Sequence, residues 1–166
     1  MSKDLTTKQF SEYLSQVVPQ VEDSLVNTIK LCCKKVQDDI QYSMAHTERN
    51  TAVSYYTNNK TKAHHPSMPG NPPAVDSGKL RESIKYEVHG EGKEVYGIVG
   101  SSQTDENYAV YTEYGTTKGG WGGHGMAPRP WLRPAMTKNN DWIRKSIANA
   151  VAAGLKGLLP QTGDEI

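Results

Sequence analysis

Residues 108–116 read Tyr108-Ala109-Val110-Tyr111-Thr112-Glu113-Tyr114-Gly115-Thr116, and this stretch decides how the chain folds. A glycine-rich loop follows from Thr117 to Met126, and the chain continues as Ala127-Pro128-Arg129-Pro130-Trp131-Leu132-Arg133-Pro134-Ala135. Glu113 is the only carboxylate in this segment, and Arg129 and Arg133 lie between prolines. If the loop folds back, Glu113 and one of these arginines can meet as a bidentate ion pair that locks the ends of the loop. The pattern predicts a structural device rather than an active site, because a lone carboxylate lacks a catalytic partner.

Two secondary structures fit residues 108–114. A strand would place Tyr108, Val110, Thr112 and Tyr114 on one face. Two turns of helix would group Tyr108 with Tyr111, Thr112 and Gly115. We favour the helix.

Helical patterns flank this segment on both sides. Apolar residues recur at steps of three and four from Thr6 to His46, which predicts an amphipathic helix with a kink or a break after Val18, where Pro19 follows. A second helical pattern begins at Pro134, which suits a first helical position, and Pro160 should end it. Residues 161–166 read as a loose acidic tail.

Between these patterns, the sequence alternates as a β-hairpin does. Ile84, Tyr86 and Val88 alternate with polar residues, Gly90–Lys93 form a turn, and Glu94–Gly100 return as the partner strand. The patterns alone favour a long N-terminal helix that lies over a sheet rather than a coiled coil, because the apolar repeat is not a strict heptad. The whole chain, residues 1–166, is expected to form one domain.

Composition favours a subunit of a larger assembly over a monomer. Only 36% of the 166 residues are hydrophobic and the mean hydropathy is −0.68, while nine tyrosines and three tryptophans supply side chains typical of interfaces. Lys+Arg 19 against Asp+Glu 18 leaves a net charge of +1, so no strong field draws the chain to nucleic acid or membrane. No apolar run is long enough to suggest a membrane span.

Residues 48–77 form a polar, proline-rich stretch that we expect to be a flexible arm, ordered only against a neighbour. Its basic residues leave open a different class of function, a small nucleic-acid-binding module. The side chains that would contact phosphate are Lys60, Lys62, His64 and His65. A steep loss of DNA affinity with rising salt would identify such a module.

No pattern in the sequence supports an enzyme, a cofactor or a metal site. The segment from Gly70 to Leu80 resembles a phosphate-binding loop, but Pro73 and Leu80 stand where that motif needs a glycine and a hydroxyl. The five histidines lack a paired metal spacing. Cys32 and Cys33 are adjacent, so a bond between them would be strained, and we expect reduced thiols with one of them buried.

Three motifs in order resemble a family of neck proteins of tailed bacteriophages, which includes the lambdoid tail-completion proteins, also called minor tail protein Z. The first is Pro69-Gly70-Asn71-Pro72-Pro73-Ala74-Val75-Asp76-Ser77-Gly78-Lys79-Leu80-Arg81-Glu82-Ser83-Ile84. The second combines Tyr108-Ala109 with Glu113-Tyr114-Gly115-Thr116, and the third is Arg129-Pro130-Trp131-Leu132-Arg133-Pro134-Ala135. The resemblance covers residues 69–135.

The resemblance implies an α+β fold, in which a long N-terminal helix and a C-terminal helix pack on a small antiparallel β-sheet with extended loops. It also implies a structural virion protein that forms a homo-oligomeric ring, with six copies as a candidate number, at the head–tail junction. The ring would join the DNA-filled head to the tail and leave a lumen through which DNA passes without sequence-specific contact. Its neighbours would be head-completion or adaptor proteins and tail-terminator or tail-tube proteins, and the chain would be made in the host cytoplasm. A tail terminator ring that caps the tail tube is the alternative within this class. The structural or interface candidates are Pro72, Gly78, Leu80, Arg81, Tyr108, Glu113, Gly115, Trp121, Arg129, Pro130, Trp131 and Arg133.

Overall fold

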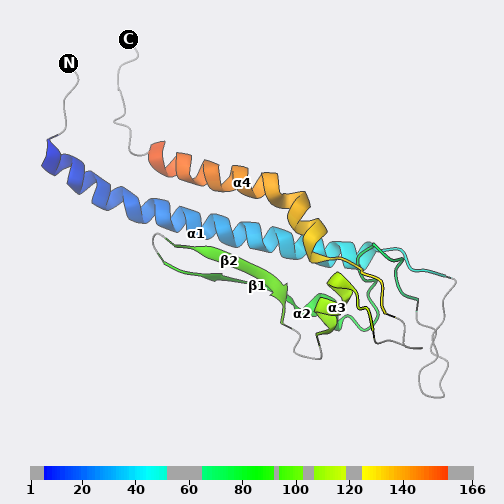
Figure 1. Cartoon of the computed structure of the whole chain (residues 1–166). Coiled ribbons are helices and arrows are strands. Elements are labelled where there is room, and N and C mark those ends of the chain that lie inside the picture. The colour runs from blue at the N-terminus through cyan, green and yellow to red at the C-terminus, as the bar shows by residue number, and fades with distance from the viewer. Residues whose placement is uncertain (1–5, 52–64, 92–93, 103–106, 119–124, 157–166) are drawn as a thin grey trace, which may run out of the picture. The chain divides into compact units, whose positions relative to one another are not determined.

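The computed structural model describes residues 6–51, 65–91, 94–102, 107–118 and 125–156 (Figure 1). Its elements are α1 (Thr7–His46), α2 (Lys79–Ser83), β1 (Ile84–His89), β2 (Tyr96–Ser101), α3 (Tyr108–Tyr114) and α4 (Leu132–Lys156). Helices α1 and α4 pack together and on the two-stranded antiparallel sheet of β1 and β2. The predicted α+β class, the hairpin and the helix over residues 108–114 are therefore confirmed.

Helix α1 runs without interruption through Pro19, so the predicted break after Val18 is wrong (Figure 1). A proline inside a helix removes one hydrogen bond, because it has no N–H to donate to the carbonyl four residues earlier. Here that carbonyl belongs to Ser15, and both Ser15 and Pro19 are exposed. Water can hydrate the freed carbonyl, which lowers the cost of continuing the helix.

The structure divides into two compact units. The first contains residues 1–33, 87–98 and 141–166, and its described core includes Val17, Cys32, Cys33 and Ala150. Both cysteines are buried, not only one as expected, and burial raises the pKa of both thiols. The thiols are not joined by a disulfide.

Two glycines allow close approach to α1 within this first unit. A Cβ added at Gly97 of β2 would lie 2.1 Å from Sγ of Cys33 and 3.1 Å from Cγ2 of Ile29. A Cβ added at Gly154 of α4 would lie 2.4 Å from Cγ2 of Val21. Neither position has room for a side chain, so these glycines set how closely β2 and α4 approach α1.

We therefore expect Gly97→Ala to lower the free energy of unfolding by about 1–3 kcal/mol, because the added methyl group overpacks the contact with α1. Thermal unfolding followed by circular dichroism measures this loss. Gly100→Ala on the same strand is the matched control, because a Cβ there meets no atom within 4 Å. Combining Gly97→Ala with Cys33→Ala should recover part of the loss, and equal stability of the two single glycine variants would contradict the assignment.

The second unit contains residues 34–86 and 99–140. Its core includes Val36, Ile40, Met44, Leu80, Ile84, Ala109, Trp131 and Ala135. Side-chain amides from α1 bind the chain where α2 passes into β1: Gln37 donates to the carbonyl of Ile84 at 2.6 Å, and Gln41 donates to that of Arg81 at 3.1 Å. The bond from Gln41 adds a second donor to the carbonyl of Arg81, which also accepts from the amide of Ile84 at the end of α2.

The arm predicted over residues 48–77 is held at its base. Arg49 and Ser67 form an isolated antiparallel bridge, and the amide of Asn50 donates to the carbonyl of Pro66 at 2.8 Å. The guanidinium of Arg49 also donates to the carbonyl of Val75 at 2.6 Å. Residues 52–64 of the predicted arm lie outside the described part of the chain, as do the tail at 161–166 and Pro160.

None of the described helices combines the length and apolar character needed to cross a membrane.

Candidate functional site

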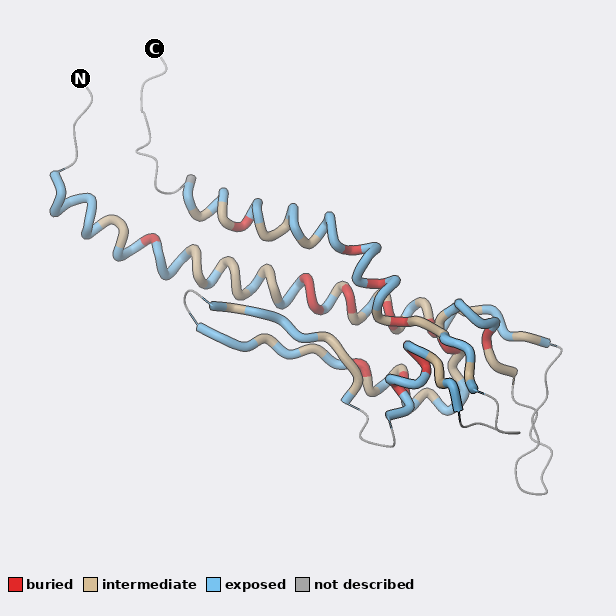
Figure 2. Tube along the Cα trace, in the orientation of Figure 1, coloured by how far each residue is buried: buried red, intermediate tan, exposed pale blue. Residues whose placement is uncertain are grey.

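Helix α3 of the second unit has a buried side and an exposed aromatic side. Ala109, Thr112 and Glu113 are buried. The opposite side consists of large apolar or aromatic residues that are 43–63% exposed: Tyr108, Val110, Tyr111 and Tyr114. Surface helices usually place polar residues there. We call these four residues the α3 face; Figure 2 shows how exposed and buried positions alternate along this part of the chain.

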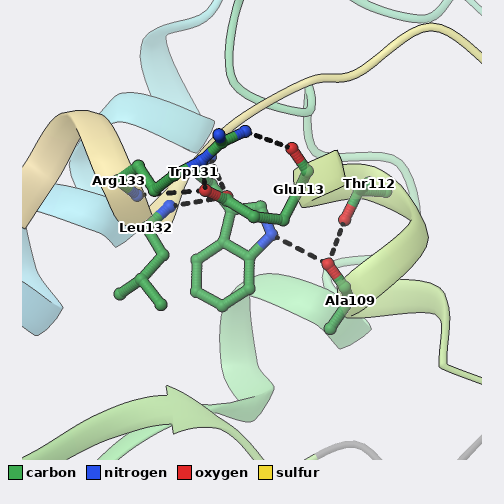
Figure 3. A network of polar contacts seen from close by, with 6 residues as sticks. All are labelled: Ala109, Thr112, Glu113, Trp131, Leu132 and Arg133. Atoms are coloured by element: carbon green, nitrogen blue, oxygen red, sulfur yellow. Dashed lines mark hydrogen bonds and ion pairs between the residues drawn. The ribbon is translucent and has the colours of Figure 1, made fainter. Parts of the chain in front are cut away.

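Glu113 caps the start of α4 (Figure 3). Its Oε2 accepts hydrogen bonds from the backbone amides of Trp131 at 2.7 Å and Leu132 at 2.9 Å. Its Oε1 accepts from the amide of Arg133 at 3.1 Å and from Nε of the same residue at 2.9 Å. The side chain is only 3% exposed. Each carboxylate oxygen therefore accepts two hydrogen bonds, which fills its capacity and leaves it unavailable as a general acid or base.

The capping at α4 is complete. The first four amides of a helix have no partner within the helix. At α4 three of these, from Trp131, Leu132 and Arg133, donate to Glu113, and the fourth position is Pro134, which has no N–H. Pro134 is thus the third helical residue and not the first as predicted, and it costs no hydrogen bond because its amide would have been unpaired anyway.

Arg133 forms the predicted ion pair with Glu113, but the predicted bidentate geometry is wrong. One guanidinium nitrogen contacts the carboxylate, while Nη2 donates to the backbone carbonyl of Glu113 at 3.1 Å. The reason is that the backbone amides of α4 already occupy the other carboxylate positions. The guanidinium carbon also lies 4.8 Å from the ring centroid of Tyr114, a cation–π distance. Arg133 therefore joins the buried cap to the exposed α3 face.

Arg129 has a different role. Its Nε donates to the carbonyl of Ser67 at 3.1 Å, and its backbone amide donates to the carbonyl of Thr112 at 2.7 Å. It links α3 to the base of the arm instead of pairing with Glu113. The charge of Arg129 also affects the pKa of the Tyr108 hydroxyl. Burial raises the pKa of Tyr108, the positive charge of Arg129 opposes that rise, and Asp76 adds to it.

Trp131 fills the space behind the cap. It is 4% exposed, and its Nε1 donates to the carbonyl of Ala109 at 3.2 Å (Figure 3). The hydroxyl of Thr112 donates to the same carbonyl at 2.9 Å. Trp131 thus fixes α3 against the start of α4 by packing and by one hydrogen bond.

The pKa of Glu113 lies below its usual value. Burial alone would raise it, but the hydrogen bonds from the amides of Leu132, Trp131 and Arg133, together with the Arg133 side chain, outweigh that effect. Each of these donors stabilises the ionised carboxylate. The cap is therefore charged at neutral pH.

The other predicted site residues separate into two groups. Gly115 and Pro130 lie at the same junction as Glu113; Gly115 has φ +76, and a Cβ there would lie 2.6 Å from the carbonyl oxygen of Met126. Gly78, Leu80 and Arg81 lie at α2, where Gly78 has φ +83 before the helix and Leu80 enters the core. Pro72 is half-buried in the loop before α2. Trp121 lies outside the described residues.

Sequence reasoning missed one polar cluster between α1 and α4. Asn139 is 2% exposed and donates to Oδ2 of Asp39 at 2.7 Å, and Lys138 reaches Oδ1 of the same carboxylate at 3.4 Å. Burial alone would raise the pKa of Asp39, but the hydrogen bond from Asn139 and the charges of the nearby lysines outweigh burial and hold the pKa below its usual value. The available signal in the sequence was Asn139, a polar residue on the apolar side of the predicted C-terminal helix.

A hollow of about 400 Å³ lies beside the junction, lined by residues 114–117 and 125–128. Among these described lining residues there is no acid, histidine, lysine or arginine. Within the described ranges, no group of three or more His, Cys, Asp or Glu side chains is placed to hold a metal ion.

Comparison with known proteins gives no match: no family model, curated protein or solved structure is significantly similar to this chain.

Proposed function

We propose that this chain is a structural subunit of a homo-oligomeric ring at the head–tail junction of a tailed bacteriophage. The ring would join the filled head to the tail as a neck or tail-completion protein and leave a lumen for DNA. The proposal combines the resemblance of residues 69–135 with the geometry of the α3–α4 junction. In this reading the chain catalyses no reaction.

The observation that carries the proposal is the α3 face. Three tyrosines and a valine are exposed on a helix of seven residues that is held by a buried carboxylate, a tryptophan and two arginines. Tyrosine is enriched at protein interfaces because a large amphipathic ring loses little conformational freedom on binding. Prior fixation of the helix removes a further entropic cost of association. A rigid aromatic face suits permanent contact with another protein.

The polar network at the junction also supports a structural role. Both oxygens of Glu113 are occupied by helix amides and Arg133, so the carboxylate holds the backbone together instead of meeting a substrate. The three motifs that resemble neck proteins lie close together here. The amide of Gly70 in the first motif donates to the carbonyl of Pro128, just before the third motif, and Glu113 of the second motif accepts from Leu132 of the third. Their common task is to fix the α3 face.

The α3 face predicts the outcome of a single substitution. Val110→Lys places a charge at a position that is 51% exposed, so the fold should survive while assembly is lost. We expect the purified chain to form closed rings with a central lumen in electron micrographs, and the variant to remain in small species in multi-angle light scattering. Labelled protein should locate at the neck of the particle.

Lys8→Glu is a matched control, because Lys8 is exposed on α1 and belongs to a different compact unit from α3. It should leave ring formation intact. Rings that form equally well from the Val110→Lys chain, or label found elsewhere on the particle, would contradict the proposal. DNA affinity that falls steeply with salt would instead favour the nucleic-acid-binding module.

A further inference from the structure

β2 is an edge strand without the features that usually prevent edge strands from pairing. In the described part of the chain the sheet holds β1 and β2 alone, so one side of β2 carries no strand. Its sequence, Tyr96-Gly97-Ile98-Val99-Gly100-Ser101, contains neither a charge nor a proline. Edge strands that must stay unpaired commonly carry one or the other. β1 differs, since it carries Lys85, Glu87 and His89, and its Ile84 carbonyl already accepts a hydrogen bond from Gln37.

The register of the hairpin shows which backbone groups of β2 face its open side. The amide of Ser102 donates to the carbonyl of Ser83, and the rings of His89 and Tyr96 lie 5.8 Å apart, so residues 84–89 pair with 101–96. Backbone groups alternate in direction along an antiparallel strand. Those of Tyr96 and Ile98 therefore face β1, and those of Gly97 and Val99 face the open side.

This edge is complementary to itself. If a second copy of β2 lies antiparallel with Ile98 opposite its own counterpart, Gly97 and Val99 of each copy exchange backbone hydrogen bonds. In that register Tyr96 lies opposite Gly100, and Gly97 lies opposite Val99. Tyr96 and Val99 thus each meet a glycine, and aromatic–glycine cross-strand pairs are favourable at such positions. The exposed side chains of Tyr96 and Ile98, at 56% and 51%, would gather in the middle of the joint sheet.

We propose that β2 pairs antiparallel with β2 of a second copy of this chain, centred on Ile98, to form a four-stranded sheet with the order β1-β2-β2-β1. Apolar side chains lie at its centre, and the charged strands β1 form its two edges. This is the arrangement of a stable interface, with an apolar core and a polar rim. The charges on β1 then limit further growth of the sheet.

The strand contact goes beyond the proposed ring. A two-fold contact uses the same surface on both copies, so it joins two copies and leaves no free surface of that kind for a third. A cyclic ring needs a different, heterologous contact. The α3 face would provide that second contact. The proposal of a strand-paired dimer can therefore be tested independently of the proposed ring.

Oxidative cross-linking of single-cysteine additions tests the register. Ile98→Cys should give a covalent dimer of twice the 18.3 kDa chain mass on a non-reducing gel, because residues opposite one another in a non-hydrogen-bonded antiparallel pair are about 4.5 Å apart at Cα, within disulfide range. Tyr96→Cys is the matched control on the same strand and face. Its counterpart in the partner copy would be displaced by four residues, about 13 Å, so it should stay monomeric on the gel.

Light scattering of Ile98→Lys completes the test. This variant should lose the dimer because two like charges would face each other across the two-fold axis, while Val110→Lys should keep the dimer and lose only larger rings. Cross-linking at position 96 equal to that at 98, no cross-link at 98, or an intact dimer in Ile98→Lys would each overturn the strand pairing. If Val110→Lys loses rings but keeps the dimer, both the ring contact and the strand pairing are supported. If Val110→Lys still forms rings, only the proposed ring contact through the α3 face is contradicted.

Discussion

Replacing Glu113 with glutamine should lower the free energy of unfolding by about 3 kcal/mol, although the two side chains have nearly the same shape. Both oxygens of the native carboxylate accept hydrogen bonds, from the amides of Trp131, Leu132 and Arg133 and from the Arg133 side chain. Glutamine keeps one oxygen and presents an NH₂ group where the second acceptor stood. Donors then face donors in a site that is 3% exposed, and buried backbone amides lose their partner. Urea unfolding followed by circular dichroism measures the loss.

Two further variants separate the cap from its charge partner. Arg133→Ala should cost much less, about 1 kcal/mol, because its side chain is 58% exposed and the three backbone amides keep their acceptor. Glu12→Gln, on the exposed side of α1, should leave stability unchanged. If Arg133→Ala cost as much as Glu113→Gln, the ion pair and not helix capping would hold the junction.

The pH dependence of stability reports the same group. The pKa of Glu113 is lower in the folded chain than in the unfolded chain, so its contribution is fully present above the unfolded value of about 4.3 and is lost as the pH falls through the folded value. Native protein should therefore lose stability more steeply than Glu113→Gln when the pH is lowered from 5 towards about 3. Parallel curves for the two proteins would contradict the depressed pKa. Asp39, whose pKa is also lowered, contributes to both curves equally.

The sequence predicted that Glu113 would meet an arginine, but it did not identify the main partners of the carboxylate. The sequence shows one acid between tyrosines and two arginines between prolines, so an ion pair could be expected. Every residue except proline has a backbone amide, so the sequence does not show which amides donate to a given carboxylate. That three of them converge on Glu113 depends on where α4 begins, and the proline signal placed that start two residues too late. The choice between Arg129 and Arg133 depended on the base of the arm, where Ser67 accepts from Arg129.

The fold followed from periodicity, and its close contacts did not. Steps of three and four predicted α1 and α4, and alternation predicted the hairpin, because both patterns express which side of an element is buried. Pro19 shows the limit of local rules, since an exposed position lets a helix tolerate a proline that would end it elsewhere. The sequence also did not show that Gly97 lies against α1. A glycine in a strand signals a close approach, but only the packed structure shows that Cys33 is what approaches.

Trp131→Ala should have the largest effect of any single substitution at this junction, a loss of about 3–5 kcal/mol in the free energy of unfolding. The indole is 4% exposed and lies between α3 and the start of α4, so alanine would leave a cavity that the capped helix end cannot easily collapse to fill. Far-ultraviolet circular dichroism during denaturant unfolding measures the loss without relying on tryptophan fluorescence. Trp142→Ala is the matched control. Trp142 is 41% exposed, and its removal should cost about 1 kcal/mol or less.

Trp131→Phe separates packing from hydrogen bonding in this contact. The carbonyl of Ala109 accepts from Nε1 of Trp131 and also from the hydroxyl of Thr112, so loss of the indole N–H leaves that carbonyl with a donor. The cost of an unsatisfied buried acceptor is then avoided, and the phenylalanine variant should lose only about 1 kcal/mol. A loss as large as that of the alanine variant would mean that the hydrogen bond holds α3 in place. The small loss expected here would instead show that packing of an aromatic ring at this position, and not the hydrogen bond, keeps the α3 face rigid enough to serve as an interface.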